Sequence, residues 1–244
     1  MIKVITRSQI LALVPHKNLS TKVWKNEKLL PEIRLKLLKI AQDFYAYLDV
    51  GAQLLDVTLT GSLANFNYTK VSDFDLHLII NYKDVDDNEA LVEKLLSAKK
   101  SVWNQKHDIT IKGHEVELYA QNETEPHHST GVYSIVKDDW IVKPERIRGV
   151  TNLDSAKKKA KQIMREINVI LKSPNRMPRI EKMKEKIKNM RQSGLQRSGE
   201  YSAENLAFKL LRRTDYIKML YDAYDRDYDS YMSLDEIHQS EKLK

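Results

Sequence analysis

Residues 58–80, TLTGSLANFNYTKVSDFDLHLII, constrain the fold of this chain more than any other stretch. One apolar run leads into Gly61-Ser62, and a second apolar run, which begins after a polar interval, carries Asp73 and Asp75. The pattern predicts a strand, a tight turn, a short helix and a second strand. Because alternate residues of a strand leave the same face, we expect the two carboxylates to project side by side.

The rest of the chain divides into a mixed half and a helical half. The spacing of apolar and turn residues predicts helices over 30–48, 87–103, 154–172, 177–192 and 203–222, strands over 54–60, 73–82 and 131–136, and a hairpin around Lys112-Gly113. We therefore expect an α/β (α+β) domain with a mixed sheet over residues 1–145. A basic all-helical domain over 146–222 and an acidic tail over 223–244 would follow it.

The positive charge of the chain is concentrated in its second half. The net charge is +7, yet residues 143–220 hold 21 Lys/Arg against 8 Asp/Glu, a net of +13, which leaves −6 for the rest. A basic module beside an acidic catalytic half favours a polyanionic partner, and RNA is the partner we expect. Lysine-rich helices that are simply well solvated are the alternative.

Composition excludes several classes of function. The absence of cysteine rules out disulfides and thiolate zinc sites. No apolar stretch reaches membrane-spanning length, and the apolar run near the N-terminus is too short for a signal peptide, so we expect a cytoplasmic protein. The sequence leaves the oligomeric state open.

The Gly-Ser pair and the two carboxylates together point to phosphate chemistry. Gly61 lacks a Cβ and lets a ligand approach the backbone, while Ser62, at the expected helix start, offers N–H groups and a hydroxyl to an anion. Asp73 and Asp75 would repel each other on one strand face unless a cation lies between them. Mg²⁺, or Mn²⁺ in its place, takes oxygen ligands and shares phosphate oxygens, so we expect it here.

A site of this kind requires a third carboxylate from a neighbouring strand. The stretch GHEVELYAQ offers Glu115 and Glu117 on one strand face. Glu117 lies between Val116 and Leu118, deeper in the apolar run, and is favoured. Glu115 lies nearer the turn and is the alternative.

Gly61-Ser62, Asp73-Phe74-Asp75 and Glu117 resemble the signature of the DNA polymerase β-like nucleotidyltransferase superfamily. More narrowly, LTGSLANFNYTKVSDFDLHLII, GHEVELYAQ, GVYSIVKDDWIVKP and MRQSGLQRSGEYSAENLAFKLLRR resemble nucleotidyltransferases of large phages, over roughly residues 24–220. The resemblance implies that the three carboxylates bind two metal ions and that Gly61 and Ser62 contact the nucleotide phosphates. For a phage-encoded enzyme the compartment would be the host cytoplasm.

Several further residues are candidates for a place in the site. Tyr133 fits stacking on the nucleobase, with packing in the core as an equal alternative. Lys209 and Arg213 share a helix face that would reach a triphosphate or an RNA backbone, unless that face, with Arg212 beside it, is simply solvated. His77 lies on the same strand face as the carboxylates, and a structural role is favoured for it.

Two other patterns resemble metal sites. His127-His128 lie in a polar loop with no third ligand at a suitable spacing, so a solvated loop is favoured. Residues 225–236, DRDYDSYMSLDE, match the ligand spacing of a calcium loop, yet Ser230 stands where a glycine is required. A calcium site is therefore the less favoured interpretation.

Together these residues favour a magnesium-dependent nucleotidyltransferase. An acceptor hydroxyl would attack the α-phosphate of an NTP and release pyrophosphate. The resemblance implies ATP as the donor. RNA, such as the 3′ end of a tRNA, is the favoured acceptor. The alternatives are transfer to a small molecule or a protein, synthesis of a cyclic oligonucleotide, or a catalytically silent nucleic-acid-binding module.

Overall fold

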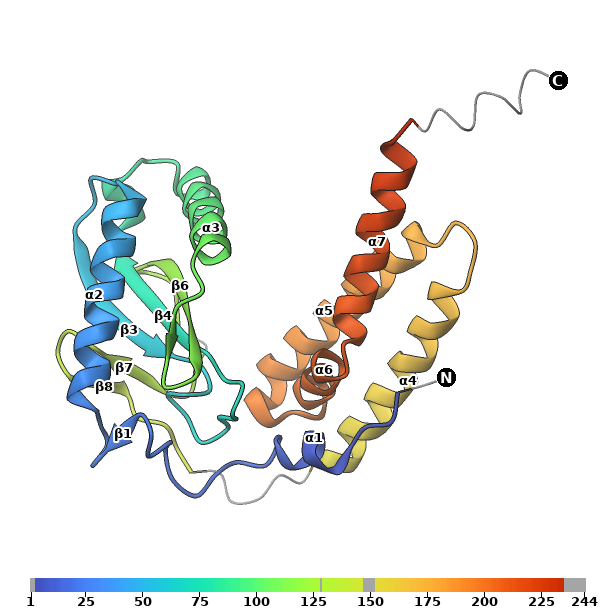
Figure 1. The fold of residues 1–244 in the computed structure, drawn as a ribbon, viewed down its shortest axis with the longest axis horizontal. Coiled ribbons are helices and arrows are strands. Elements are labelled where there is room, and N and C mark those ends of the chain that lie inside the picture. The colour runs from blue at the N-terminus through green and yellow to red at the C-terminus, as the bar shows by residue number, and fades with distance from the viewer. Residues whose placement is uncertain (1–2, 128, 147–151, 235–244) are drawn as a thin grey trace. The chain divides into compact units, whose positions relative to one another are not determined.

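The computed structural model describes residues 3–127, 129–146 and 152–234, which form two compact units (Figure 1). Residues 14–146 make up the sheet unit, and residues 3–13 together with 152–234 make up the helical unit. The first residues of the chain, which the sequence grouped with the sheet, therefore belong with the helices.

The sheet unit is built on a six-stranded mixed sheet in the order β5-β6-β4-β3-β7-β8. Its strands are β3 (Leu54–Thr60), β4 (Phe74–Ile80), β5 (Thr110–Ile111), β6 (His114–Asn122), β7 (Val132–Ser134) and β8 (Asp139–Val142). The neighbours β4 and β6 run parallel, and the other neighbouring pairs run antiparallel. The expected mixed α/β architecture is confirmed, as is the hairpin at Lys112-Gly113.

Alternation along the central strands gives the sheet an apolar and a polar face. On β4, Phe74, Leu76 and Leu78 are buried in one core with α2 (Pro31–Leu48) and α3 (Glu89–Lys106). α3 also makes the crossover that a parallel connection from β4 to β6 requires. The alternate β4 side chains, among them Asp75 and His77, lie on the opposite, polar face.

The segment between β3 and β4 differs from the prediction. Residues 61–73 pass through turns and contain no helix. The segment is held by tertiary hydrogen bonds: the His16 amide donates to the Phe66 carbonyl (2.6 Å), and the Trp24 indole donates to the Leu63 carbonyl (2.8 Å). Partners distant in sequence thus satisfy backbone groups that a helix would have paired internally.

A short hairpin that the sequence analysis did not predict precedes α2. It pairs β1 (Trp24–Lys25) with β2 (Lys28–Leu29) through Asn26-Glu27, both of which have a positive φ. Two-residue hairpin turns usually carry glycine at the second position, so Asn-Glu gives little warning of one. A 3₁₀ turn, η1 (Tyr82–Asp84), follows β4.

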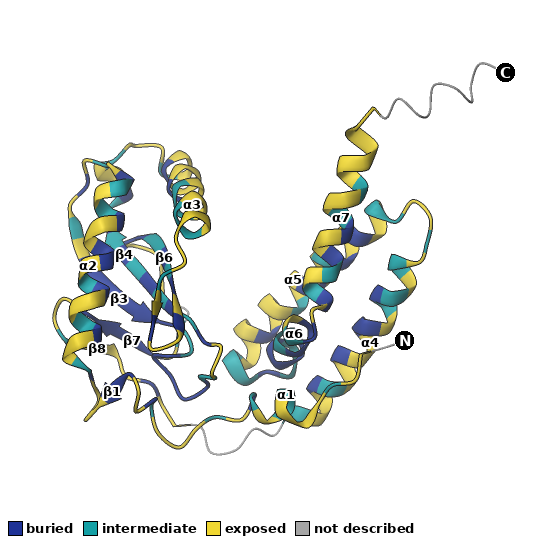
Figure 2. Cartoon of the chain, in the orientation of Figure 1, coloured by how far each residue is buried: buried dark blue, intermediate teal, exposed yellow. Residues whose placement is uncertain are grey.

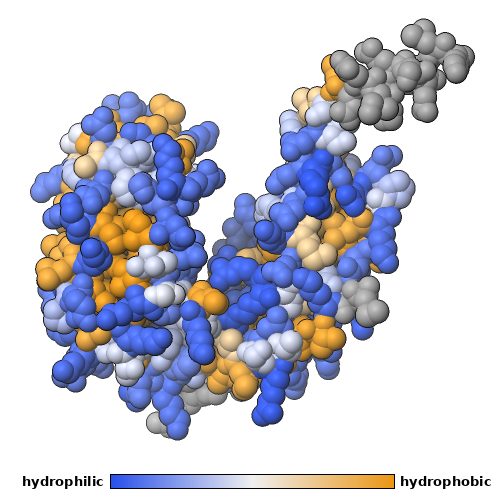
Figure 3. Space-filling view, viewed as in Figure 1, coloured by the Kyte–Doolittle hydropathy of each residue, from blue (hydrophilic) through white to orange (hydrophobic). Residues whose placement is uncertain are grey.

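The helical unit packs amphipathic helices around a core of its own. They are α1 (Arg7–Leu11), α4 (Leu153–Leu171), α5 (Met177–Ser198), the 3₁₀ turn η2 (Gly199–Tyr201), α6 (Ala203–Arg213) and α7 (Tyr216–Met232). Figure 2 shows each long helix burying one side and exposing the other. The exposed sides carry mostly hydrophilic residues in the view of Figure 3.

Residues 3–13 join this unit through specific contacts. The Lys3 ammonium lies 2.9 Å from the Asp215 carboxylate, and the Gln9 side chain donates to the Arg213 carbonyl (3.1 Å). Leu13 is buried in the helical core. A capping box at Thr6 begins α1.

The C-terminal part of the helical unit corrects two predictions. The single helix expected over 203–222 is divided at Asp215, whose φ of 63° breaks the helical hydrogen-bond pattern. α7 then continues to Met232, beyond the expected boundary at residue 222. Most of the candidate calcium loop is therefore helix, and its last ligand position, Glu236, lies outside the described residues.

Within the described part of the chain, no helix combines the length and the apolar character needed to cross a membrane.

Candidate active site

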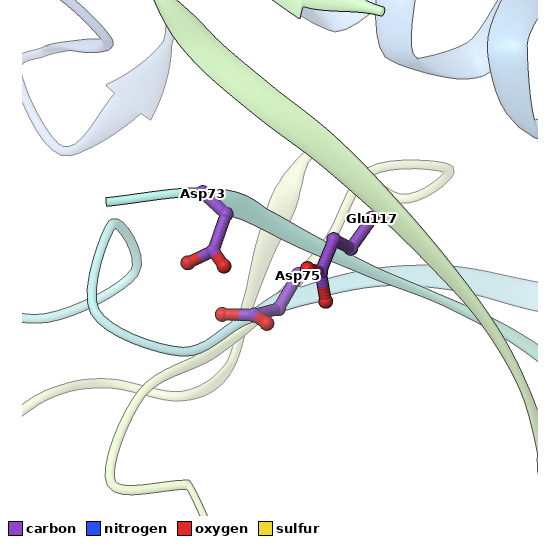
Figure 4. Close-up of side chains that lie close together, drawn as sticks. All are labelled: Asp73, Asp75 and Glu117. Atoms are coloured by element: carbon purple, nitrogen blue, oxygen red, sulfur yellow. The ribbon is translucent and has the colours of Figure 1, made fainter. Parts of the chain in front are cut away.

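Three carboxylates meet on the polar face of the sheet. Asp73 directly precedes β4, Asp75 is its second residue, and Glu117 lies on β6 in register with Asp75. One oxygen from each carboxylate lies within 4.8 Å of the others, and all three side chains are half-buried. Figure 4 shows them directed toward a common point.

Strand alternation explains why these residues meet and why Glu115 does not join them. Val116 and Leu118 of β6 are buried in the core, so Glu117 points to the polar face beside Asp75. Glu115 lies on the same face but is exposed, and it pairs with Thr110 at the short edge strand. The structure thus brings together the three carboxylates that the sequence favoured.

The donor set of this cluster suits a hard divalent cation. In the part of the chain that the structure describes, no lysine or arginine forms an ion pair with Asp73 or Glu117. Three half-buried carboxylates repel one another, and a cation at their centre relieves that repulsion. Carboxylate oxygens at this separation fit Mg²⁺ or Mn²⁺, which retain open positions for water and phosphate.

Gly61 lies against the cluster and cannot carry a side chain there. Its φ of 73° is left-handed, and a Cβ built on it would lie 1.7 Å from Oδ2 of Asp75. Glycine is therefore required on two grounds, backbone conformation and space. Its absent side chain brings the turn backbone within reach of whatever the carboxylates bind.

Ser62 is tied into the turn and does not begin a helix. Its hydroxyl donates to Oγ of Ser72 (2.7 Å), which also accepts from the Thr69 amide (2.8 Å). The Ser72 carbonyl accepts a hydrogen bond from Nδ1 of His114, the first residue of β6 (2.5 Å). The expected helix start at Ser62 is therefore wrong, because the residue lies in a turn.

Ser72 and His114 were not predicted from the sequence. Ser72 directly precedes Asp73 and is hydrogen-bonded to Ser62 of the Gly-Ser turn. His114 joins the Ser72 carbonyl to β6. Both are buried polar residues. No motif or spacing marks them, because their partners lie about ten and about forty residues away in the chain.

Two further residues of the polar face, Tyr119 and His77, contact each other, and Tyr119 also contacts the cluster. The Tyr119 hydroxyl donates to Oε2 of Glu117, and its ring stacks on His77 with centroids 4.8 Å apart. Burial raises the pKa of Tyr119, and the hydrogen bond to Glu117 raises it further. Burial lowers the pKa of His77 to about 4, although its hydrogen bond to Gln121 (2.8 Å) opposes that change. The structure thus gives His77 the packing role that the sequence favoured.

Tyr133 corrects another prediction. It is fully buried on β7, in edge-to-face contact with Trp24 (4.9 Å) and Trp140 (5.0 Å). Its hydroxyl donates to Asp138 (2.7 Å). A ring enclosed in this way has no face free for a nucleobase, so the expected stacking role is wrong.

The basic residues expected near the nucleotide lie in the helical unit. Lys209 is mostly buried and its ammonium lies 3.0 Å from Glu200; burial lowers the pKa of Lys209. The Arg213 guanidinium donates to the Gln9 carbonyl (3.4 Å), whereas Arg212 is exposed. These contacts give Lys209 and Arg213 structural partners, and their contact with a nucleotide stays a prediction.

The structure adds no support for a metal site at His127-His128. His127 is exposed, and His128 lies outside the described residues. The carboxylate cluster is the metal-compatible group found in the described ranges.

Comparison with known proteins adds little to this geometry. No family model and no curated protein matches the chain. Among solved structures, a STING-associated CdnE cyclic di-GMP synthase from Capnocytophaga granulosa is 16% identical over 84% of each chain, with a TM-score of 0.20. A likeness of this size carries no argument about activity. The site must therefore be interpreted from its own residues.

Proposed function

We propose that this chain is a metal-dependent nucleotidyltransferase, which moves a nucleoside monophosphate from an NTP to an acceptor hydroxyl. The observation that carries the proposal is the meeting of Asp73, Asp75 and Glu117, with one oxygen of each within 4.8 Å of the others. Gly61 adds to it, because it leaves no side chain between the turn backbone and Asp75. The sequence signature of the superfamily combines these same elements.

The residues of the site would divide the work as follows. Asp73 and Asp75 would hold two divalent ions, and Glu117 would complete the ligands of one. Ions bound there would activate the acceptor hydroxyl and stabilise charge on the phosphates and the leaving pyrophosphate. The turn at Gly61 would let backbone groups approach the triphosphate. Holding both substrates in line would lower the barrier further.

RNA is the acceptor we propose, on the basis of charge. Exposed lysines and arginines line the outward sides of α4 and α5, among them Lys158, Lys161, Arg165, Lys182 and Lys188. Rows of unburied positive charge suit a phosphate backbone. ATP is proposed as the donor from the resemblance alone. A small-molecule or protein acceptor, and a cyclic oligonucleotide product, are distinguishable outcomes of the test below.

The first test follows a label from substrate to product. The full-length protein would be incubated with each α-labelled NTP, Mg²⁺ or Mn²⁺, and either total RNA or cell lysate. We expect the label in RNA with ATP; label in protein, in a small molecule or in a cyclic nucleotide would change the acceptor but keep the reaction class.

The second test uses Asp75→Asn, with exposed Asp87→Asn as the matched control. Transfer should fall at least about a thousandfold in Asp75→Asn only, because the metal ions supply several kcal/mol. Without divalent ions this variant should unfold at a temperature no lower than that of the wild type, since one repelling charge is removed. Mg²⁺ should then stabilise the wild type and not the variant. Near-normal transfer by folded Asp75→Asn would contradict the proposal.

A further inference from the structure

One oxygen of the third carboxylate is already engaged. The Tyr119 hydroxyl donates to Oε2 of Glu117, two residues earlier on the same face of β6. The hydrogen bond occupies one lone pair of Oε2 and weakens that oxygen as a ligand, so Oε1 becomes the stronger donor to a cation. The contact therefore makes the two oxygens of Glu117 unequal as metal ligands.

Tyr119 is held firmly enough to keep this contact. Its ring stacks on His77 of β4, with centroids 4.8 Å apart and an interplanar angle of 18°. His77 is itself fixed by a 2.8 Å hydrogen bond to Gln121. The Lys100 ammonium, from α3, lies 4.5 Å from the centre of the Tyr119 ring. Contacts from β4, β6 and α3 thus constrain the phenol, so its hydroxyl is preorganised toward Glu117.

Divalent cations differ in how they use a carboxylate. Ca²⁺ takes six to eight oxygens and often binds both oxygens of one carboxylate, whereas Mg²⁺ requires near-octahedral geometry and takes one oxygen from each. A glutamate that binds best through Oε1 therefore suits Mg²⁺ or Mn²⁺ and weakens the bidentate binding that Ca²⁺ often uses. Mutation of a residue that hydrogen-bonds a metal ligand commonly lowers the metal affinity by about 10–100-fold.

We propose that Tyr119 is a positioning residue that sets the metal selectivity of the site, because it holds Oε2 of Glu117 and leaves Oε1 as the stronger ligand for the cation. The inference rests on the proposed metal site and deepens it. In this role Tyr119 acts through its hydrogen bond to Glu117. A tyrosine that merely packed the sheet would alter the affinities for all cations alike.

The test measures metal binding directly and needs no turnover. Mn²⁺ binding to the full-length protein is followed by electron paramagnetic resonance, with Ca²⁺ and Mg²⁺ as competitors. In Tyr119→Phe, which keeps the ring and its stacking contacts, Ca²⁺ should displace Mn²⁺ at least about tenfold more effectively, relative to Mg²⁺, than in the wild type. An unchanged ratio of Ca²⁺ to Mg²⁺ competition would overturn the inference, even if all affinities fell together.

Two further variants make the outcome unambiguous. Tyr45→Phe removes a hydroxyl that donates to the Ala52 carbonyl (2.6 Å) elsewhere in the sheet unit, and it should leave the ratio unchanged. Glu117→Gln should weaken Mn²⁺ binding at least about tenfold; if it does not, the proposed metal site itself fails. If Glu117→Gln weakens binding but Tyr119→Phe leaves the ratio unchanged, the selectivity role alone fails. Thermal unfolding verifies that each variant is folded.

Discussion

At Gly61 the chain has room for a hydrogen atom and for nothing larger. The residue combines a left-handed backbone with direct contact to Asp75, so two requirements coincide at one position. Gly113, in the hairpin between β5 and β6, shares the left-handed backbone, yet a Cβ there would meet nothing within 4 Å. The two glycines therefore separate the cost of conformation from the cost of crowding.

Gly61→Ala should impair the site more than the fold. The added methyl group would displace the Asp75 carboxylate, and small displacements of catalytic groups can cost about 100-fold in rate, so we expect transfer to fall by at least about that factor. The free energy of unfolding should fall by about 1 kcal/mol, the usual cost of a left-handed alanine. Chemical denaturation and the label-transfer assay measure the two effects.

Gly113→Ala is the matched control for this prediction. It carries the same backbone penalty without the contact to a carboxylate, so we expect similar destabilisation and normal transfer. Equal losses of transfer in the two variants would show that crowding at Asp75 is not what matters.

The carboxylates were predictable at this scale, and their supports were not. Strand alternation places Asp73, Asp75 and Glu117 on one face from the sequence alone, and the burial of Val116 and Leu118 favours Glu117 over its neighbour. Ser72 and Tyr119 support the site through their hydroxyl groups. Serines and tyrosines are also common on protein surfaces, so their presence in the sequence did not mark them as part of the site. A pattern with period two says which face a side chain leaves, and it does not say which partner the side chain meets there.

Among the elements, α7 departs furthest from expectation. A left-handed Asp215 ends the turn after α6, and α7 then runs through the acidic sequence that resembled a calcium loop. Arg176, the N-cap residue of α5, donates two hydrogen bonds to the Asp227 carboxylate, at 2.7 and 2.8 Å. This pair explains why Asp227 is oriented toward the unit and not toward a bound ion.

Asp227→Asn should destabilise the helical unit by up to about 1 kcal/mol at neutral pH, the usual range for a partly exposed ion pair. The hydrogen bond from Arg176 lowers the pKa of Asp227 below its ordinary value. The stabilisation is therefore complete above the pKa of the unfolded chain and is lost as the pH falls through the folded pKa. The difference between wild type and variant in urea unfolding should shrink below about pH 4.

Asp225→Asn serves as the control, because Asp225 is exposed and falls at the first ligand position of the same loop pattern. It should change stability little at any pH. Should Ca²⁺ raise the unfolding temperature of the wild type, and should both variants abolish that rise, the helix would have to reorganise around an ion and the interpretation of α7 would be wrong.

The existence of the elements was predictable, and their ends were less so. Apolar spacing located α2, α3, α4 and α5, whose buried stripes are long. The break between α6 and α7 lacks a glycine or proline, and a single left-handed aspartate marks it. The turns of residues 61–73 are set by partners such as Trp24 and His16, which local sequence does not reveal.

At the scale of the whole molecule, charge separates the two units. The basic excess of residues 143–220 falls largely on the outward sides of α4 and α5, while the carboxylate cluster lies in the sheet unit. Composition alone predicted this separation. Exposed residues of α4 and α5 offer the cleanest test of RNA binding. Arg213 is less suitable, because it is half-buried against Gln9 and its removal would disturb the fold.

Reversing Lys158, Lys161 and Arg165 to glutamate should weaken RNA binding while sparing nucleotide binding. The three residues are exposed on one side of α4, opposite its buried stripe. Each lost phosphate contact should lower the slope of log K against log salt by about one. Titration of labelled tRNA at several salt concentrations measures both quantities.

Lys36, Lys94 and Lys106, exposed on α2 and α3, provide a control of equal charge change. Reversal of these three should weaken RNA binding far less. Equal weakening by both triple variants would indicate a general charge effect, and an unchanged affinity in the α4 variant would remove the support for RNA as acceptor.

The contacts of residues 3–13 with α6 and α7 have a consequence for the order of the chain. The helical unit is discontinuous in sequence, because the sheet unit is inserted between residues 3–13 and the rest of the helical unit. An excised fragment that starts at residue 152 would lack Leu13 from its core and the ion-pair partner of Asp215. A fragment of residues 14–146, by contrast, keeps the sheet, its two covering helices and all three carboxylates in one continuous piece of chain.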